Sequence, residues 1–358
     1  MTSMAPLRGV RVVDLSWLLP GPLCTSLLAD LGADVLKIER PGDGDYARTL
    51  LPGLFRLVNR GKRSAVFDLH EPGDRGRLLD IVAQADIFVE GFRPGVVDRF
   101  GVGYADVRKR NPKIVYVSIS GYGQSGPMRS HPGHDINYCA EAGLLAIPST
   151  VDQERPYRMQ LPVSDIAGGM YAALSALAAL RQRDITGLGA QVDVSLTECA
   201  FAWSAIRWAD APASDQDNWK HVSPGNDIFC AADGEWLAVA LVEDKFWAGF
   251  CRAARALGAR VNLDPHSAPR PNASRDERIA SRNAIAATIA LFPSSAWLLQ
   301  AGKQDIPVTK VAKRFAKDSM PGYPVRLPGS CAGAPAPALG ADNARLTANP
   351  AAAWEIRN

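Results

Sequence analysis

Residues 10–38, VRVVDLSWLLPGPLCTSLLADLGADVLKI, contain the unit that decides the fold. The run Val10–Leu15 predicts a buried strand, Pro22–Leu31 predicts a helix that ends at Gly32, and Ala33–Ile38 predicts a second strand. A strand, a helix and a second strand within about 30 residues are typical of two parallel strands joined by a crossover helix. We therefore expect an α/β protein built outward from this unit.

The same alternation continues toward residue 120. Strands are expected at Ser64–Leu69, Asp86–Glu90 and Lys113–Ser120, with helical patterns at Arg75–Gln84 and Ala105–Arg110. Alternating strands and helices predict a mostly parallel sheet that helices cover on both faces. Ligands of such sheets bind beyond the carboxyl ends of the strands, so site residues are expected there.

The pattern changes in the second half of the chain. A long helix is expected over Ile166–Arg183, then a strand at Gln191–Ser195 and a helix that reaches Trp208. The stretch Ala211–Asn218 is rich in Ala, Pro, Ser and Asp, which indicates a linker.

Beyond this linker, Asp233-Gly234 stands between two apolar runs, which is a strong hairpin signal. Helical segments follow at 244–257 and 274–292. We therefore expect a large domain over 1–210, a small α+β domain over 220–310, and a return to the large domain over 311–358.

Composition narrows the classes of function. The 358 residues carry 40 basic and 37 acidic side chains, a balance that argues against a nucleic-acid-binding protein. The beginning of the sequence does not resemble a signal peptide, and no uninterrupted apolar run reaches the length of a membrane span. The six cysteines form no CxxC pair and the five histidines no HxxxH pair, so we expect no metal site and a cytoplasmic protein.

Residues 121–126, GYGQSG, match the GxGxxG pattern of dinucleotide-binding proteins. That fingerprint also needs a helix that opens inside the motif and an acidic residue further on. Here Pro127 follows, and the motif comes after the fifth strand rather than the first. We interpret it as a tightly turned loop.

Two polar segments lie where a parallel sheet presents its ligands. The segments 39–45, ERPGDGD, and 59–63, NRGKR, contain the cations Arg40, Arg60, Lys62 and Arg63. Arginine forks and lysine ammonium groups bind phosphates, although such charged runs are more often solvated loops. The two interpretations have about equal weight.

Two further segments carry groups that can move protons. His134 lies in GHDINY (133–138) and Asp165 in SDIAGG (164–169). A surface histidine and an Asp that caps a helix are the ordinary alternatives. The paired Gly168-Gly169 weaken a helix, and we interpret them as allowing a ligand to approach backbone donors. His134 and Asp165 are therefore a candidate acid/base pair.

Taken together, an ordered series of stretches resembles the class III CoA-transferase superfamily, the CaiB/BaiF group. The series runs from residue 7 to residue 127 and consists of LRGVRVVDLS (7–16), PGPLCTSLLADLGADVLKIERPGDGD (20–45), VNRGKRSAVFDL (58–69), DIFVEGFRPGVVDRFGVGY (86–104) and YVSISGYGQSGP (116–127). The resemblance implies a large Rossmann-like domain with a parallel sheet and a smaller α+β domain. It also implies a homodimer of interlocked subunits.

Within that superfamily, GHDINY and VSDIAGG resemble the α-methylacyl-CoA racemase branch. This implies that His134 and Asp165 are the two acid/base residues and that Glu243, in LAVALVEDKFW (237–247), pairs with the histidine. The backbone N–H of Asp135, in the first turn of a helix, is the candidate donor to an enolate oxygen.

The substrate implied by the resemblance is an acyl-CoA thioester, with no cofactor beyond its CoA. The residues implied to bind CoA are Arg40, Asn59, Arg60, Lys62 and Arg93. The main alternative is a CoA-transferase in which Asp165 is a nucleophile, and a CoA-binding protein without catalysis is a second. Transferases frequently have Gln in the first loop, where Leu19 or Pro20 stands here, which favours the racemase.

Overall fold

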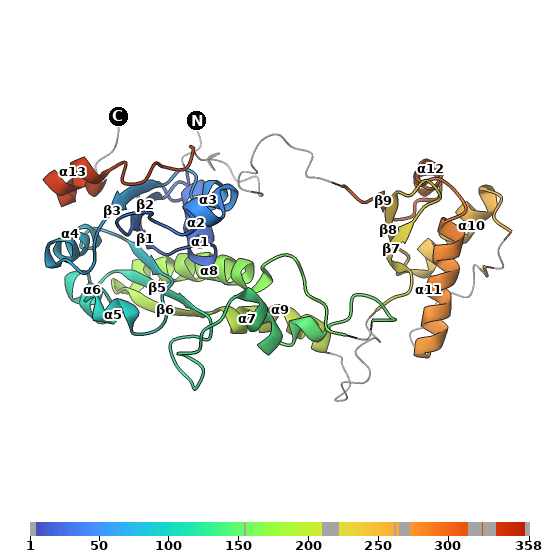
Figure 1. The fold of residues 1–358 in the computed structure, drawn as a ribbon, viewed down its shortest axis with the longest axis horizontal. Coiled ribbons are helices and arrows are strands. Elements are labelled where there is room, and N and C mark those ends of the chain that lie inside the picture. Colours follow the sequence, from blue (N-terminus) through green and yellow to red (C-terminus); the bar gives the residue numbers. More distant parts are fainter. Residues whose placement is uncertain are drawn as a thin grey trace. The chain divides into compact units, whose positions relative to one another are not determined.

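The computed structural model describes residues 5–153, 155–209, 222–260, 263–264, 273–313, 324 and 334–354. The chain divides into two compact units (Figure 1). The first holds residues 1–144, 159–203 and 319–358, and the second holds 145–158 and 204–318. No sequence pattern indicates that 145–158 groups with the second unit. The expected linker at 211–218 lies outside the described residues.

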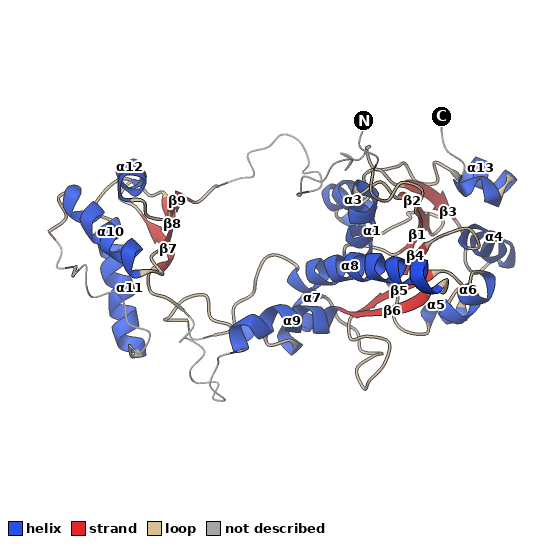
Figure 2. Cartoon of the chain, turned by 180° about the vertical axis from the view of Figure 1, so that it is seen from behind, coloured by secondary structure: helices blue, strands red, loops and turns tan. Residues whose placement is uncertain are grey.

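The first unit is built on a six-stranded sheet with the order β3-β2-β1-β4-β5-β6, in which every neighbouring pair is parallel. The strands are β1 (Arg11–Leu15), β2 (Asp34–Glu39), β3 (Arg63–Val66), β4 (Ile87–Glu90), β5 (Val115–Ser120) and β6 (Ala190–Ser195). The expected parallel sheet is therefore confirmed. Its central strands are almost wholly buried because helices cover both faces (Figure 2).

Two helices, α1 (Pro20–Asp30) and α8 (Val163–Thr186), pack on one face of the sheet, while α4 (Pro72–Val82) and α6 (Tyr104–Arg110) pack on the other. The remaining helices of this unit are α2 (Ala47–Leu50), α3 (Pro52–Val58), α5 (Val96–Arg99), α7 (Asp135–Glu141) and α13 (Asn343–Ala348), with the 3-10 turn η3 (Pro350–Trp354). Helix α9 (Leu196–Trp208) and the 3-10 turn η1 (Leu144–Ala146) begin in this unit and end in the second. Helix α8 is long and apolar enough to cross a membrane, but half of that stretch is buried, as in the core helix of a soluble protein.

The paired glycines of α8 have a different role from the one expected. A Cβ added to Gly169 would lie 2.7 Å from the carbonyl oxygen of Pro20, and one added to Gly168 would lie 2.2 Å from Leu196 Cδ2. Both glycines are buried in the packing of α8 against neighbouring elements. The interpretation that they admit a ligand to backbone donors is therefore wrong, because protein atoms fill that space.

The second unit contains an antiparallel sheet of β7 (Asn226–Cys230), β8 (Trp236–Ala240) and β9 (Val308–Lys310). The hairpin turn passes through Gly234 at φ 74°, as the Asp-Gly signal predicts. Its helices are α10 (Asp244–Ala256), α11 (Arg275–Ile289) and α12 (Ser294–Gln304), packed around a Phe250–Trp297 stack with ring centroids 5.2 Å apart.

The segment 334–354 closes the β3 edge of the large sheet. The N–H of Asp342 donates to the carbonyl of Ser64 at 2.9 Å, and the N–H of Val66 donates to Asn343 Oδ1 at 2.7 Å. An edge strand with unpaired backbone groups is open to aggregation, and this segment satisfies those of β3.

Candidate active site

A cavity of about 650 Å³ lies where the order of the sheet reverses direction. Strands β1 and β4 are neighbours, and the chain leaves them toward opposite edges of the sheet. Trp17 and Leu18, which follow β1, line this cavity together with Phe92 and Arg93, which follow β4. The switch point of an open α/β sheet is the usual place for a ligand. We call this space the switch-point cavity.

Both predicted acid/base residues line the switch-point cavity. His134 is the residue before α7. Its side chain is exposed, and its backbone N–H donates to Asn137 Oδ1 at 3.1 Å. Asp165 lies in the first turn of α8. The topology therefore brings together two groups that are 31 positions apart in the sequence, counted from 134 to 165.

The carboxylate of Asp135 connects the two helices that carry these groups. Its Oδ1 accepts hydrogen bonds from the N–H and the Oγ of Ser164, each at 2.7 Å, and from the N–H of Asp165 at 3.3 Å. Within the described ranges, the backbone N–H of Asp135 itself has no protein acceptor. Its predicted role as donor to an enolate oxygen stays a prediction.

Burial and, to a lesser extent, the neighbouring charge of Asp135 raise the pKa of Asp165 to about 7. The positive end of the helix dipole, at the first turn, favours the ionised form of a carboxyl group. Removal from water favours the protonated form, and that effect is the larger one here. Near neutral pH the Asp165 population is therefore divided between carboxylate and carboxylic acid.

The rest of the lining is cationic and aromatic. Arg93, Arg129 and His131 border the cavity, and no carboxylate of the described residues forms an ion pair with either arginine. Trp17 packs edge-on against both Tyr46 and Phe92, with ring centroids 5.1 Å apart in each case. This lining suits an anionic ligand with an apolar part.

A smaller cavity of about 220 Å³ adjoins the first, since Trp17 and Phe92 line both. Arg40 borders it, and its guanidinium lies 4.2 Å from the ring centroid of Tyr46 and donates to the Tyr46 hydroxyl at 3.2 Å. The predicted CoA residues Arg40 and Arg93 therefore lie at two connected spaces.

The other predicted CoA residues, Asn59, Arg60 and Lys62, belong to a buried network. Lys62 Nζ is fully buried and lies 2.9 Å from Asp14 Oδ2 and 2.9 Å from Asn59 Oδ1. The Arg60 guanidinium pairs with Asp30 and the carbonyl of Leu57. Their contact with CoA stays a prediction, and in this structure the Lys62 ammonium is enclosed by protein oxygens.

Glu243 belongs to the second unit, where it precedes α10. Its carboxylate is exposed and lies 2.9 Å from Lys245 Nζ. Its pairing with His134 stays a prediction.

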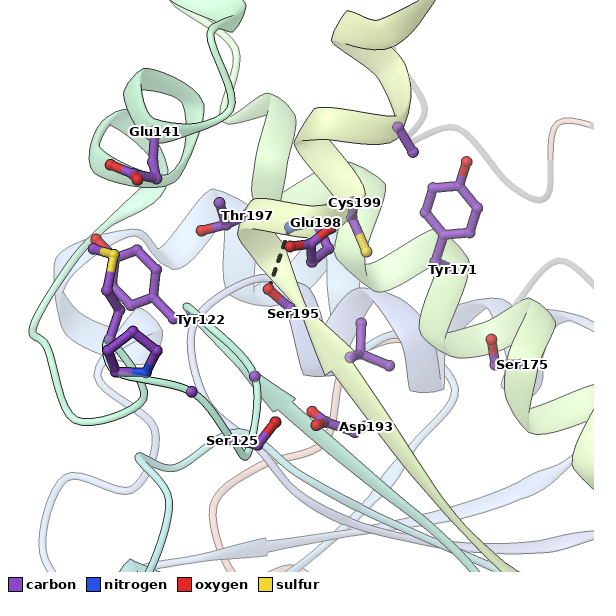
Figure 3. Close-up of a pocket in the computed structure, with 16 residues that line it drawn as sticks. Tyr122, Ser125, Glu141, Tyr171, Ser175, Asp193, Ser195, Thr197, Glu198 and Cys199 are labelled. Carbon is purple, nitrogen blue, oxygen red and sulfur yellow. Dashed lines mark hydrogen bonds between the residues drawn. The ribbon is translucent and has the colours of Figure 1, made fainter.

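A second cavity, also of about 650 Å³, shares no lining residue with the switch-point cavity. Figure 3 shows the carboxylates of Glu141, Asp193 and Glu198 around it, with Ser195 Oγ accepting the N–H of Glu198 at 3.2 Å. Three carboxylates would repel the phosphates of CoA. Electrostatics therefore favours the switch-point cavity as the active site.

Several lining residues, Trp17, Tyr46, Phe92, Arg129 and His131, are absent from the sequence prediction. Trp17 and Phe92 directly follow predicted strands, so their position past a carboxyl end was an available signal. Arg129 and His131 reach the cavity through a long loop whose path no local pattern specifies.

Comparison with known proteins shows the family to which the chain belongs. The model of CoA-transferase family III matches residues 7–318. Acetyl-CoA:oxalate CoA-transferase of Acetobacter aceti is 32% identical over 360 residues, which cover 90% of each chain. Alpha-methylacyl-CoA racemase of Homo sapiens is 35% identical over 250 residues, covering 67% of this chain and 63% of that protein.

A crystal structure of a CAIB/BAIF family protein from Brucella suis has the same fold. It superposes with a TM-score of 0.82 at 24% identity, covering 97% of this chain and all of that one. Both the sequence match over most of the chain and the shared architecture lead to one conclusion: the protein is an enzyme of CoA-transferase family III.

Proposed function

We propose that this protein moves the α-proton of a 2-methylacyl-CoA, as an α-methylacyl-CoA racemase does. The observation that carries the proposal is the pair of proton carriers in one cavity, His134 and an Asp165 with a pKa of about 7. A racemase needs each group as base in one direction and as acid in the other. A carboxyl group that titrates near neutral pH is available in both states.

The chemistry proceeds in two steps. One residue removes the proton from the α-carbon, and the electron pair of the broken C–H bond forms an enolate whose negative charge lies on the thioester oxygen. The other residue returns a proton to the opposite face. An imidazole can both accept and donate a proton, which suits His134 for the second position. A backbone N–H such as that of Asp135 would stabilise the enolate oxygen.

CoA transfer is the second candidate, and one observation favours it. The relative that matches 90% of both chains is a CoA-transferase named for oxalate. In that reaction the Asp165 carboxylate attacks the thioester carbonyl, and CoA leaves as a thiolate. Arg93 and Arg129, which form no ion pair with a described carboxylate, would then hold the carboxylate of the acceptor acid.

One experiment separates the two candidates. The protein is incubated with a single enantiomer of a 2-methylacyl-CoA in deuterated buffer, without any free carboxylic acid. Deuterium at the α-carbon together with loss of optical purity supports the racemase. CoA that moves only after a second carboxylic acid is added supports the transferase and overturns the racemase.

The remaining predictions belong to the same proposal. The interlocked homodimer would supply Glu243 to His134, and CoA would extend from Asp165 past Trp17 toward Arg40. A cytoplasmic location and the absence of a cofactor beyond CoA also stay predictions.

A further inference from the structure

The wall of the switch-point cavity contains a residue in an unusual backbone conformation. Leu18 has φ +63°, in the left-handed region that side chains with a Cβ rarely adopt. Of the non-glycine residues that the structure describes, Leu18 shares a positive φ only with Asp305, an exposed residue of the second unit. Such conformations persist only where the surroundings impose them, and they concentrate at functional sites.

Three buried side chains impose the conformation of the loop after β1. The N–H of Ser16 donates to Asp14 Oδ1 at 3.0 Å, and the carbonyl of Ser16 accepts from Lys37 Nζ at 2.7 Å. Two residues later, the N–H of Leu18 donates to Asp45 Oδ1 at 3.1 Å. Asp14, Lys37 and Asp45 are all 0% exposed. The loop is thus fixed at both ends of the Ser16–Leu18 segment.

The anchors also hold each other. Lys37 Nζ lies 2.9 Å from Asp45 Oδ2, and Asp45 Oδ1 accepts a further hydrogen bond from the N–H of Ala47 at 2.9 Å. Removing one partner of a buried ion pair leaves an uncompensated charge, so neither group can turn away without cost. Because Lys37 belongs to strand β2 and Asp45 accepts the N–H of Leu18, the Lys37–Asp45 pair fixes the position of Leu18 relative to that strand.

The return of the loop into α1 is equally constrained. A Cβ on Gly21 would lie 2.2 Å from Ser16 Cβ, so the chain passes closely over its own turn. Glycine would adopt the Leu18 conformation without strain, yet the chain places a leucine there. The gain from this leucine is an apolar side chain beside Trp17 in a cavity whose lining also includes polar groups such as Asp165.

We propose that Lys37 and Asp45 are positioning residues that hold Leu18 in its left-handed conformation, so that the Trp17–Leu18 wall aligns a bound acyl-CoA thioester with Asp165. This inference rests on the proposed acyl-CoA function. Leu18 lines the switch-point cavity but not the smaller cavity that Arg40 borders, so its side chain acts on the alignment of the thioester rather than on the binding of CoA.

The central test is Leu18→Gly. Glycine relieves the backbone strain, so the unfolding temperature should be equal to or higher than that of the wild type. The kcat for α-proton exchange or CoA transfer should nevertheless fall about tenfold or more, with KM for acyl-CoA within about twofold, because misalignment costs rate rather than binding. Asp305→Gly is the matched control, which relieves the other positive φ and should leave kcat unchanged.

Asp45→Asn tests the anchor itself. The amide keeps an oxygen for the N–H of Leu18 but loses the ion pair with Lys37, so deuterium exchange of the peptide containing residues 16–19 should accelerate and kcat should fall. If Asp45→Asn does not fold, the Leu18→Gly result decides alone. A wild-type kcat in Leu18→Gly, a rise in KM alone, or a lower unfolding temperature would each overturn the inference. Wild-type protein inactive toward every acyl-CoA would instead overturn the proposed function.

Discussion

The Oδ1 atom of Asp135 lies 2.7 Å from the backbone nitrogen of Ser164. This hydrogen bond joins the start of α7 to the start of α8, and so relates the residue after His134 to the residue before Asp165. The same carboxylate contributes to the raised pKa of Asp165. Asp135 therefore connects the two helix starts that carry His134 and Asp165, and adds to the effect of burial on the proton affinity of Asp165.

Asp165→Asn should lose activity and gain stability. Proton transfer should fall by roughly 10²–10⁴-fold, the usual contribution of a positioned acid or base. The folded pKa of about 7 exceeds the ordinary 3.8. Ionisation of Asp165 therefore costs no stability below about pH 3.8. The cost grows as pH rises from there to about 7 and is constant above. At about pH 8 the free energy of unfolding of the variant should exceed that of the wild type by roughly 1–2 kcal/mol, which thermal unfolding detects as a higher midpoint. An unchanged midpoint would contradict the burial argument.

His134→Gln separates the two candidate reactions without changing the fold, because the side chain is exposed. Deuterium exchange at the α-carbon should fall by roughly 10²–10⁴-fold, since glutamine cannot carry a proton. Any CoA transfer should continue, because that reaction uses Asp165 as nucleophile. His70→Gln, at an exposed histidine outside the switch-point cavity, is the control for loss of an imidazole, with exchange measured at saturating acyl-CoA because His70 lines the smaller cavity. Equal exchange rates in both variants would exclude His134 as an acid or base.

Glu90 makes a second pH-dependent contribution to the free energy of unfolding. It is 2% exposed at the end of β4, and burial raises its pKa from 4.5 to about 7 despite a hydrogen bond from the N–H of Phe92. The folded state holds this proton more tightly, so stability is lost as pH rises from about 4.5 through 7 and is constant above. Glu90→Gln should remove up to about 3 kcal/mol of that loss. Melting curves at about pH 5 and pH 8 test this, and an identical pH dependence in wild type and variant would refute it.

Gly169→Ala should destabilise the first unit. The added Cβ would meet the carbonyl oxygen of Pro20 at 2.7 Å, and backbone cannot move aside as a side chain can. Overpacking of this kind costs about 1–3 kcal/mol. Gly76→Ala in α4 is the control, because nothing lies within 4 Å of its added Cβ and alanine favours a helix by about 0.5–1 kcal/mol. A stable Gly169→Ala protein would show that α1 and α8 do not pack as closely as described.

Arg40→Ala and Lys62→Met should differ although both remove a cation predicted to bind CoA. Arg40 borders an open cavity, so its loss should raise KM for acyl-CoA about tenfold or more with little change in the unfolding temperature. Lys62→Met leaves Asp14 buried and unpaired, at a cost of about 3–5 kcal/mol in stability. If Lys62→Met instead unfolds like the wild type and only raises KM, direct contact with CoA is the better interpretation.

Local sequence patterns are sufficient to predict the parallel sheet of the first unit. The parallel strands β1, β2, β4 and β5 were predicted to within three residues because continuous apolar runs between helices are typical of buried parallel strands. The three-residue β9 was missed because an isolated Val308–Lys310 has no period to detect.

The site was predictable only in part, for a physical reason. His134 and Asp165 stood out by their chemistry, and the structure places both at one cavity. The left-handed Leu18 was not predictable, since its conformation depends on Asp45, a buried residue 27 positions away. Lys37 in the middle of an apolar strand indicates a buried ion pair, but the pattern of charges in the sequence does not identify Asp45 as its partner.

The segment that closes the β3 edge carries a consequence for biosynthesis. Asp342 bonds to Ser64 across 278 positions of sequence, so the ribosome must synthesise almost the whole chain before that edge is satisfied. The edge strand β3 of the nascent first unit therefore keeps unpaired backbone groups while the second unit is translated. This interval is when a chaperone would be needed most, and truncation before residue 334 should yield a protein that aggregates during expression.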